Sequence, residues 1–193
     1  AMETDFRKRR LGWAEEFRGR QDFGHFRIRS GRINLDPELM FREAPLRMLE
    51  IFHLALEQKA DIHPQALQRI TRGLPALGDA TRDDPRAAEE FLAILTSKDN
   101  PERVLRLMNE SGVLGRFLPD FGKIVAMMQF DMYHSYTVDE HTIKVIGVLH
   151  DIGTGGLAET APVATSVMPE IESRLVLFVA ALLHDIAKGR DGD

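Results

Sequence analysis

The sequence of 193 residues contains no cysteine. Disulfide frameworks, thiol nucleophiles and zinc sites built on thiolates are therefore excluded. Any metal ion must be bound by histidine and carboxylate side chains instead. The absence of cysteine also agrees with a reducing compartment, so we expect a cytoplasmic protein.

Long apolar runs are missing as well. The longest run, from Leu175 to Leu183, is far shorter than the roughly 20 residues that a membrane-crossing helix needs. We expect it to form a helix that is buried on all sides in a soluble core. The basic residues near the N-terminus are followed by Leu11-Gly12-Trp13-Ala14-Glu15-Glu16 rather than by an apolar block, so we expect neither a signal peptide nor a membrane partner.

An excess of positive charge is also lacking, since the formal net charge is -5. Affinity for nucleic acid comes mainly from lysine and arginine, so we expect no nucleic-acid partner. The cluster from Arg7 to Arg10 is a local exception, and we interpret it as a solvated face or frayed end. With 44% hydrophobic and 28% charged residues, the chain has the composition of an ordinary globular protein.

Proline marks the starts of several predicted helices. Four prolines follow a polar or capping residue and precede an amphipathic stretch: Asp36-Pro37, His63-Pro64, Asp84-Pro85 and Asn100-Pro101. Proline lacks an N–H that would be unpaired in a first helical turn, and the preceding side chain can accept from free amides. We therefore predict helices that begin near residues 37, 64, 85 and 101.

Further signals divide the remaining chain. Ala44-Pro45 should end the first helix and open another, with a buried stripe at three-to-four-residue spacing, formed by Leu46, Leu49, Phe52 and Leu56. The helix from residue 101 should stop at Gly112. A short helix is expected around Ile124–Met128, after Pro119.

Only one segment has the pattern of β-structure. Apolar and polar residues alternate between Phe23 and Leu35 around Ser30-Gly31, which predicts a small β-hairpin. Thr154–Pro169 is rich in glycine, alanine, threonine and proline, and we predict a loop there. The expected fold is mostly α: a helical bundle with a small hairpin near residues 23–35.

His141 is the first candidate functional residue. Thr137 and Glu140 have the spacing of a capping box, which would place His141 near the start of a helix. At 100° per residue, His141 shares a face with Val145, Val148 and Leu149, so its imidazole should point inward. A hydrogen-bonded core histidine is the alternative interpretation.

His184 and Asp185 follow the apolar run directly, with Lys188 one turn later. Imidazole and carboxylate are both ligands of divalent cations. Lys188 can meet a phosphate oxygen near such a metal, or pair with Asp185 at i+3. A bare His-Asp pair is weak evidence, because the chain contains a second one, His150-Asp151. His150 lies half a turn away from the His141 face, and we interpret this second pair as a helix end.

Longer strings carry a family resemblance. Asp131 to Thr142 reads DMYHSYTVDEHT, and His184 to Arg190 reads HDIAKGR. Together they resemble the uridylyl-removing domain of bifunctional PII uridylyltransferase/uridylyl-removing enzymes. Met108 to Gly115 (MNESGVLG) and the Phe41–Phe52 segment are similar to the helical region before that domain. The resemblance covers nearly the whole chain from about Phe23.

The resemblance implies a division of the chain and a set of site residues. Residues 1–22 would be a connecting or frayed segment, 23–128 the helical region, and 129–193 the incomplete first part of an HD hydrolase domain. In HD hydrolases a divalent metal is held by a His, a His-Asp pair and a later Asp. The first three fall on His141, His184 and Asp185, and the fourth would follow Asp193. Mg²⁺ or Mn²⁺ is the expected ion, although the chain by itself need not retain it.

The implied reaction is hydrolysis of the bond between UMP and a tyrosine of the PII signal protein. Lys188 would stabilise charge on the phosphate, and His134 would contact phosphate or a second metal, or else orient His141. Regions outside this sequence would contain a nucleotidyltransferase domain and domains that sense an effector such as glutamine. A homodimer is a further expectation. Two alternatives stay open: another HD phosphohydrolase acting on nucleotides, and a connector with a vestigial HD site.

Overall fold

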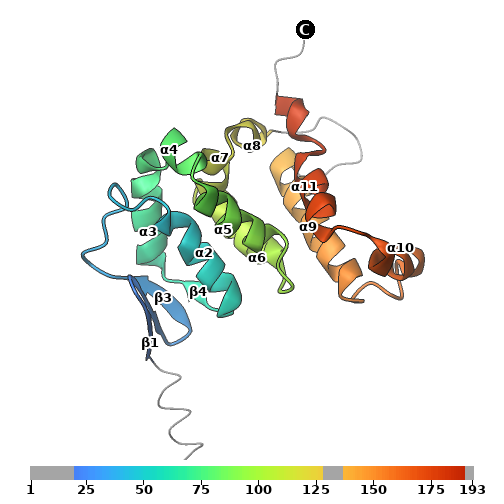
Figure 1. Ribbon diagram of the computed structural model, residues 1–193, viewed down its shortest axis with the longest axis horizontal. Coiled ribbons are helices and arrows are strands. Elements are labelled where there is room, and N and C mark those ends of the chain that lie inside the picture. Colours follow the sequence, from blue (N-terminus) through green and yellow to red (C-terminus); the bar gives the residue numbers. More distant parts are fainter. Residues whose placement is uncertain (1–19, 128–136, 190–193) are drawn as a thin grey trace, which may run out of the picture.

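A computed structural model describes residues 20–127 and 137–189 of the chain. The protein is mostly helical, with one small sheet at one end of a helical assembly (Figure 1), so the expected fold class is confirmed. One apolar core extends from the sheet through the central helices to Phe178. The basic cluster from Arg7 to Arg10 lies outside the described residues.

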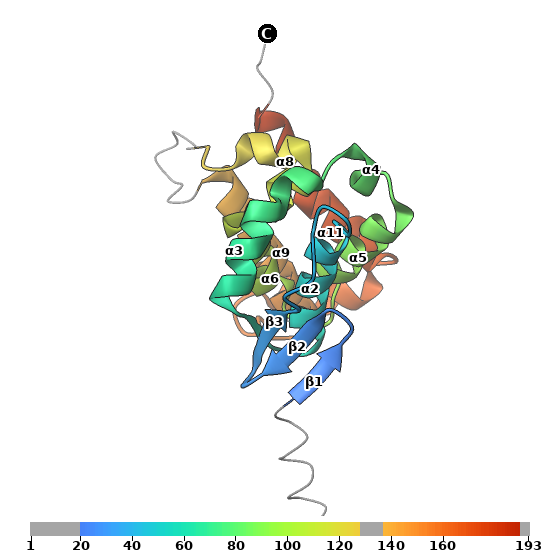
Figure 2. The ribbon, with the colours of Figure 1, turned by 90° about the vertical axis from the view of Figure 1, so that its left-hand side faces the viewer.

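The sheet is larger than the predicted hairpin. Its strands, in spatial and chain order, are β1 (Arg20–Phe23), β2 (Phe26–Arg29), β3 (Arg32–Leu35) and β4 (Asp61–Ile62). β2 and β3 form the predicted hairpin, and Ser30 and Gly31 turn it with φ of 50° and 71°. β1 pairs antiparallel with β2 (Figure 2), while β4 pairs parallel with β3. These two strands were missed because β1 is mostly polar and β4 has only two residues.

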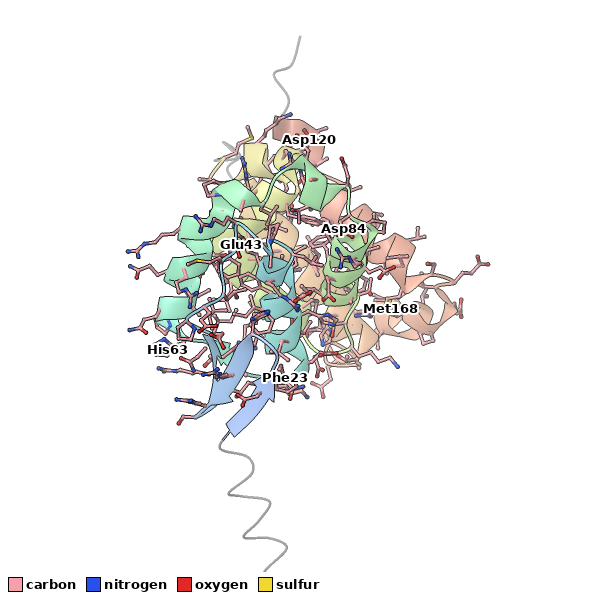
Figure 3. All side chains as sticks on the ribbon, turned by 60° about the vertical axis from the view of Figure 1, so that its left-hand side comes forward. Phe23, Glu43, His63, Asp84, Asp120 and Met168 are labelled. Carbon is pink, nitrogen blue, oxygen red and sulfur yellow. The ribbon has the colours of Figure 1, made fainter. Side chains whose placement is uncertain are left out.

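Most of the predicted helix starts are confirmed. After the sheet the helices are α2 (Arg47–Glu57), α3 (Pro64–Gly73), η1 (Leu74–Ala76), α4 (Asp79–Arg82), α5 (Pro85–Leu95), α6 (Pro101–Glu110), α7 (Val113–Phe117) and α8 (Pro119–Ile124). The side chains of His63, Asp84 and Asn100 each accept from the backbone N–H two residues on, at 3.2, 2.9 and 2.9 Å. Figure 3 labels the first two of these capping residues. The cap satisfies an N–H that has no partner within the helix.

The helix predicted from Pro37 was wrong, because this stretch forms turns. Asp36 does accept from the Glu38 N–H at 3.0 Å, as a cap would. However, the guanidinium of Arg69 donates to the carbonyl oxygens of Asp36 and Leu39, at 2.9 and 2.6 Å. The Asp36 carbonyl also accepts from the Leu39 N–H at 3.2 Å, which closes a turn of three residues and not a turn of α-helix. The α-helix α2 begins only at Arg47.

Two further boundaries differ from the prediction. The short helix α8 ends at Ile124, where the predicted one began, because Val125 is extended and Ala126 has a φ of 57°. The predicted loop at Thr154–Pro169 contains helical turns, which are α10 (Pro162–Val167) and η2 (Met168–Glu170). Pro162 is the first residue of α10 and Pro169 is the second residue of η2, so proline lies in the first turn of both, as it does in the longer helices.

The last part of the chain forms a pair of helices, α9 (Val138–Gly153) and α11 (Arg174–Leu183), followed by the turn η3 (Ile186–Gly189). α9 packs against α6, and α11 packs against α9 (Figure 1). Arg174 fixes the start of α11, since it donates to the carbonyl oxygens of Thr96 and Ser97 at 3.0 and 2.8 Å. Its guanidinium also lies 4.0 Å from the centre of the Phe178 ring.

The apolar helix α11 is not buried on all sides, which corrects the prediction. Phe178, Ala181 and Leu182 are buried, but Leu175, Val176 and Leu183 are 44%, 66% and 45% exposed. These three side chains therefore leave one apolar face of α11 only partly covered within the described residues. Among those residues no helix combines the length and the apolar character that a membrane crossing requires.

Candidate metal centre

α9 places His141 in its second turn. Thr137 is the N-cap, and its carbonyl oxygen accepts from the His141 N–H at 2.9 Å. The predicted capping box is wrong: within the described residues the Thr137 side chain makes no capping hydrogen bond. The Glu140 carboxylate instead accepts from Arg106 on α6. A charged partner on another helix competes successfully with a local amide.

The His141 imidazole faces the end of α11 rather than the deepest core. Its side chain is 31% exposed, while the fully buried face of α9 contains Thr142, Ile143 and Ile146. Val145 and Leu149, which were predicted to share its face, are partly buried against the core. The helical rotation correctly predicted that these residues share one face of α9. In the folded protein α11 packs against α9.

His184 and Asp185 come directly after the last residue of α11, where the chain turns into η3. η3 rests on α8 with little space between them. A Cβ on Gly189 would lie 2.8 Å from Cβ of Lys123 and 2.9 Å from Cγ2 of Ile124. This close approach holds the turn that carries the His-Asp pair against α8.

The three residues that were predicted as metal ligands lie together. His141, His184 and Asp185 each offer a ligand atom, and these atoms lie within 4.8 Å of one another. Oδ2 of Asp185 is 3.9 Å from Nε2 of His141 and 3.4 Å from Nε2 of His184. The two imidazole rings are 5.6 Å apart between centroids and inclined at 60°.

A backbone carbonyl sets the orientation and tautomer of His184. Its Nδ1 lies 2.7 Å from the carbonyl oxygen of Ala181. Because a carbonyl oxygen can only accept, Nδ1 must carry the hydrogen, and in the neutral ring Nε2 keeps its lone pair. That lone pair is directed toward Asp185. The same arrangement orients metal-binding histidines in proteins generally.

Asp185 is the most enclosed of the three ligands, with 14% of its side chain exposed. Burial raises the pKa of its carboxyl, but the hydrogen bond from Lys188 and the charges of His184, Lys188 and His141 outweigh burial and lower that pKa below its ordinary value. Nζ of Lys188 lies 2.8 Å from Oδ2. The carboxyl is therefore ionised at neutral pH, as a metal ligand must be.

The donor set fits a borderline divalent cation. Ligands that are about 2.0–2.2 Å from one ion lie roughly 3.0–3.4 Å from each other. The distance from His184 to Asp185 is already in that range, and His141 is about half an ångström farther out. Two imidazoles and one carboxylate leave coordination positions for water or substrate oxygen. Within residues 20–127 and 137–189 this is the one group of at least three such side chains.

Two other predictions concern further histidines. His134 lies outside the described residues. His150 and Asp151 occupy the last turn of α9, as expected for a helix end, and His150 is buried. Their position separates them from the three clustered ligands, so the second His-Asp pair is not part of the site.

Asp139, a buried carboxylate two residues before His141, was not among the predicted site residues. Asp139 Oδ2 accepts from Nδ2 of Asn109 on α6 at 2.7 Å. Acidic residues are common in the first turn of a helix, so the local sequence does not distinguish Asp139 from an ordinary residue at this position. Only the packing of α6 against α9 shows that this carboxylate has a partner on another helix.

Comparison with known proteins identifies the family. Residues 26–117 match the family model described as the uridylyltransferase GlnD third domain. The bifunctional uridylyltransferase/uridylyl-removing enzyme of Azospirillum brasilense is 50% identical over 174 residues, which are 90% of this chain and 19% of the relative. The enzyme of the same name from Novosphingobium aromaticivorans is 48% identical over 97% of the chain and 20% of its own length.

A third relative with that name, from Rhodospirillum rubrum, is 45% identical over the whole chain and 21% of its own length. The chain thus spans about a fifth of the length of the curated relatives it matches. At this level of identity over most of the chain, the chain belongs to the family of bifunctional uridylyltransferase/uridylyl-removing enzymes.

Proposed function

We propose that this segment carries the uridylyl-removing site of the longer protein, a metal-dependent phosphodiesterase of the HD type that acts on uridylylated PII. The observation that carries the proposal is the convergence of His141, near the start of α9, with His184 and Asp185, which directly follow α11. The relatives are named for both uridylyl transfer and uridylyl removal. Uridylyl transfer is assigned to a nucleotidyltransferase domain outside this sequence.

The reaction is a hydrolysis. The oxygen of a water molecule forms a bond to phosphorus, and the bond between phosphorus and the tyrosine oxygen breaks. UMP and the tyrosine hydroxyl are released, and one proton from water goes to the tyrosine oxygen. A divalent metal, expected to be Mg²⁺ or Mn²⁺, supplies charge stabilisation at phosphorus and a more acidic water when it is bound.

Each residue of the centre has a distinct task in this proposal. His141, His184 and Asp185 would hold the metal, with His184 kept in the required tautomer by the Ala181 carbonyl. Lys188 is one turn from the pair and 39% exposed, so its ammonium can reach a phosphate oxygen by leaving Asp185. There it would stabilise the negative charge that develops during hydrolysis. His134 is proposed as a second phosphate or metal contact.

The test uses the full-length protein with uridylylated PII as substrate. Mn²⁺ content and UMP release are measured for the wild type, His184→Ala and Asp185→Asn. We expect both substitutions to remove metal binding and UMP release together, because each removes one of three ligands. Asp151→Asn is the matched control, since Asp151 belongs to the second His-Asp pair and lies outside the cluster; it should behave as the wild type.

Uridylyl transfer to PII, measured on the same preparations, reports whether the rest of the protein is intact. If the wild type neither binds Mn²⁺ nor releases UMP while uridylyl transfer persists, the segment is a connector with a vestigial site. If it binds metal but hydrolyses nucleotides instead of uridylylated PII, it is a different HD phosphohydrolase. Either result rejects the proposed function.

A further inference from the structure

Asp139 is a buried carboxylate in the first turn of α9, with 4% of its surface exposed. A buried charge is costly unless hydrogen bonds compensate for it. Oδ2 accepts from Nδ2 of Asn109 at 2.7 Å, and Oδ1 accepts from the backbone N–H of Ala126 at 3.3 Å. Its position near the N-terminus of α9 adds the favourable helix dipole. The carboxylate is therefore held from two directions.

These bonds join three parts of the chain. Asn109 belongs to α6, Asp139 belongs to α9, and Ala126 lies just after α8. Ala126 has a φ of 57°, an unusual conformation for a residue with a side chain. The N–H of Val138 also donates to the Met127 carbonyl oxygen at 3.1 Å. The segment after α8 is thus fastened to the first turn of α9 by one side-chain bond and one backbone bond.

Both sides of the candidate metal centre are connected to this contact between the segment after α8 and the first turn of α9. On one side, His141 follows Asp139 by two residues on the same helix. On the other side, η3 carries Lys188 and packs closely on α8, the helix that leads to Ala126. A displacement of Asp139 would therefore change the position of His141 relative to the turn that follows Asp185.

We propose that Asp139, through Asn109 and Ala126, is a positioning residue for the metal centre and sets the separation between His141 and the His184-Asp185 pair. This inference rests on the proposed function, since it assumes that the three residues bind one metal ion. Asp139 is not proposed as a metal ligand, because both of its carboxylate oxygens accept hydrogen bonds from amide donors. It acts through the backbone of α9.

The experiment compares Mn²⁺ affinity and UMP release from uridylylated PII in the full-length protein. Asp139→Asn keeps the shape of the side chain but leaves one acceptor oxygen for the two donors of Asn109 and Ala126, so its NH₂ group faces the other donor. We expect about a tenfold weaker affinity for Mn²⁺, the scale on which supporting residues act on metal sites. Added Mn²⁺ should recover most of kcat, a response that a general loss of folding would not give.

The double variant Asn109→Asp/Asp139→Asn supplies a rescue. It moves the carboxylate to α6 and leaves an amide oxygen for the Ala126 N–H, so affinity should return to within about threefold of the wild type. Ile146→Val is the stability control, because it trims the buried face of the same helix. It should lower the unfolding temperature without changing Mn²⁺ affinity. If Asp139→Asn fails to fold, Asn109→Ala removes one donor alone and takes its place.

The outcomes separate the two proposals. If the wild type binds Mn²⁺ and releases UMP, but Asp139→Asn and Asn109→Ala have unchanged affinity and kcat, the positioning role is rejected and the proposed function stands. An affinity loss without rescue in the double variant also rejects it. If the wild type itself binds no Mn²⁺, the proposed function has failed first.

Discussion

The ammonium group of Lys188 lies 2.8 Å from Oδ2 of Asp185. This is the same carboxylate oxygen that approaches the imidazoles of His141 and His184. The pairing at i+3 that the sequence allowed is therefore present, and it brings a positive charge to the centre where a metal and a phosphate are proposed to bind. Lys188 can serve both arrangements because its long side chain is flexible.

Replacing Lys188 by alanine should slow UMP release while leaving metal binding intact. Without the ammonium, charge on the phosphate loses a stabilising partner, and we expect kcat to fall about a hundredfold. Mn²⁺ affinity should stay the same or increase, because Oδ2 of Asp185 no longer has a competing cation. Lys188→Arg keeps the charge and should recover part of the rate. Normal UMP release by Lys188→Ala would exclude a catalytic role for this residue.

His134→Ala tests the second proposed phosphate contact. If His134 contributes to hydrolysis, the variant should release UMP more slowly than the wild type, by about tenfold or more for a group that assists phosphate or proton transfer. Uridylyl transfer by the same preparation is the control. An unchanged rate of UMP release would remove His134 from the site.

The titration of Asp185 should respond to Lys188. The carboxyl pKa lies below its ordinary value because Lys188 and the two histidines outweigh burial. Since the folded-state pKa is depressed, the contribution of Asp185 to stability is present above the unfolded-state pKa, about 3.9, and is lost as pH falls through the folded-state pKa. In Lys188→Ala the pKa of the Asp185 carboxyl should rise, so its contribution to stability should begin to disappear at a higher pH.

Carboxyl-carbon NMR on the metal-free chain measures this titration directly. The control is Lys123→Ala, which removes a lysine that pairs with Asp120 at i+3 on α8. Lys123→Ala should not change the pH at which the Asp185 carboxyl titrates. A carboxyl that titrates at the same pH with and without Lys188 would contradict the hydrogen bond between them.

The contact between α7 and α8 should be sensitive to glycine substitution. A Cβ on Gly122 would lie 2.7 Å from the Gly115 carbonyl oxygen, and a backbone atom cannot swing aside. We expect Gly122→Ala to lower the free energy of unfolding by about 1–3 kcal/mol. Gly78→Ala is the control, because a Cβ there meets no atom within 4 Å. Urea unfolding followed by circular dichroism compares them, and equal stability of the two variants would refute the tight contact.

Arg174 should not be replaceable by lysine. Its guanidinium donates to two carbonyl oxygens after α5 and stacks on Phe178, and burial lowers its pKa. An ammonium group cannot reproduce both the two hydrogen bonds to the carbonyl oxygens and the planar contact with the Phe178 ring. Arg174→Lys should therefore lower the free energy of unfolding by about 1–3 kcal/mol. Arg86→Lys, at an exposed arginine, should leave the urea midpoint unchanged. A wild-type midpoint for Arg174→Lys would show that charge alone suffices.

Local signals were enough for much of the helical structure. The starts of α3, α5 and α6 were predictable because proline and the side chain before it satisfy the first turn within a few residues of the same chain. The β2–β3 hairpin was predictable for the same reason, since its turn and its alternation are local. The types of ligand were also evident, because histidine and carboxylate chemistry does not depend on the fold.

The tertiary structure decided the cases in which a distant group competes with a local one. Asp36 has the same signal as Asp84, yet Arg69 takes the carbonyls that a helix would use. Glu140 bonds to Arg106 rather than to its own backbone. The rotation of α9 was enough to predict that His150 faces away from His141, but only the packing of α11 on α9 brings His184 and Asp185 to His141. Such outcomes depend on which side chains meet in space, and spacing along one helix does not contain that information.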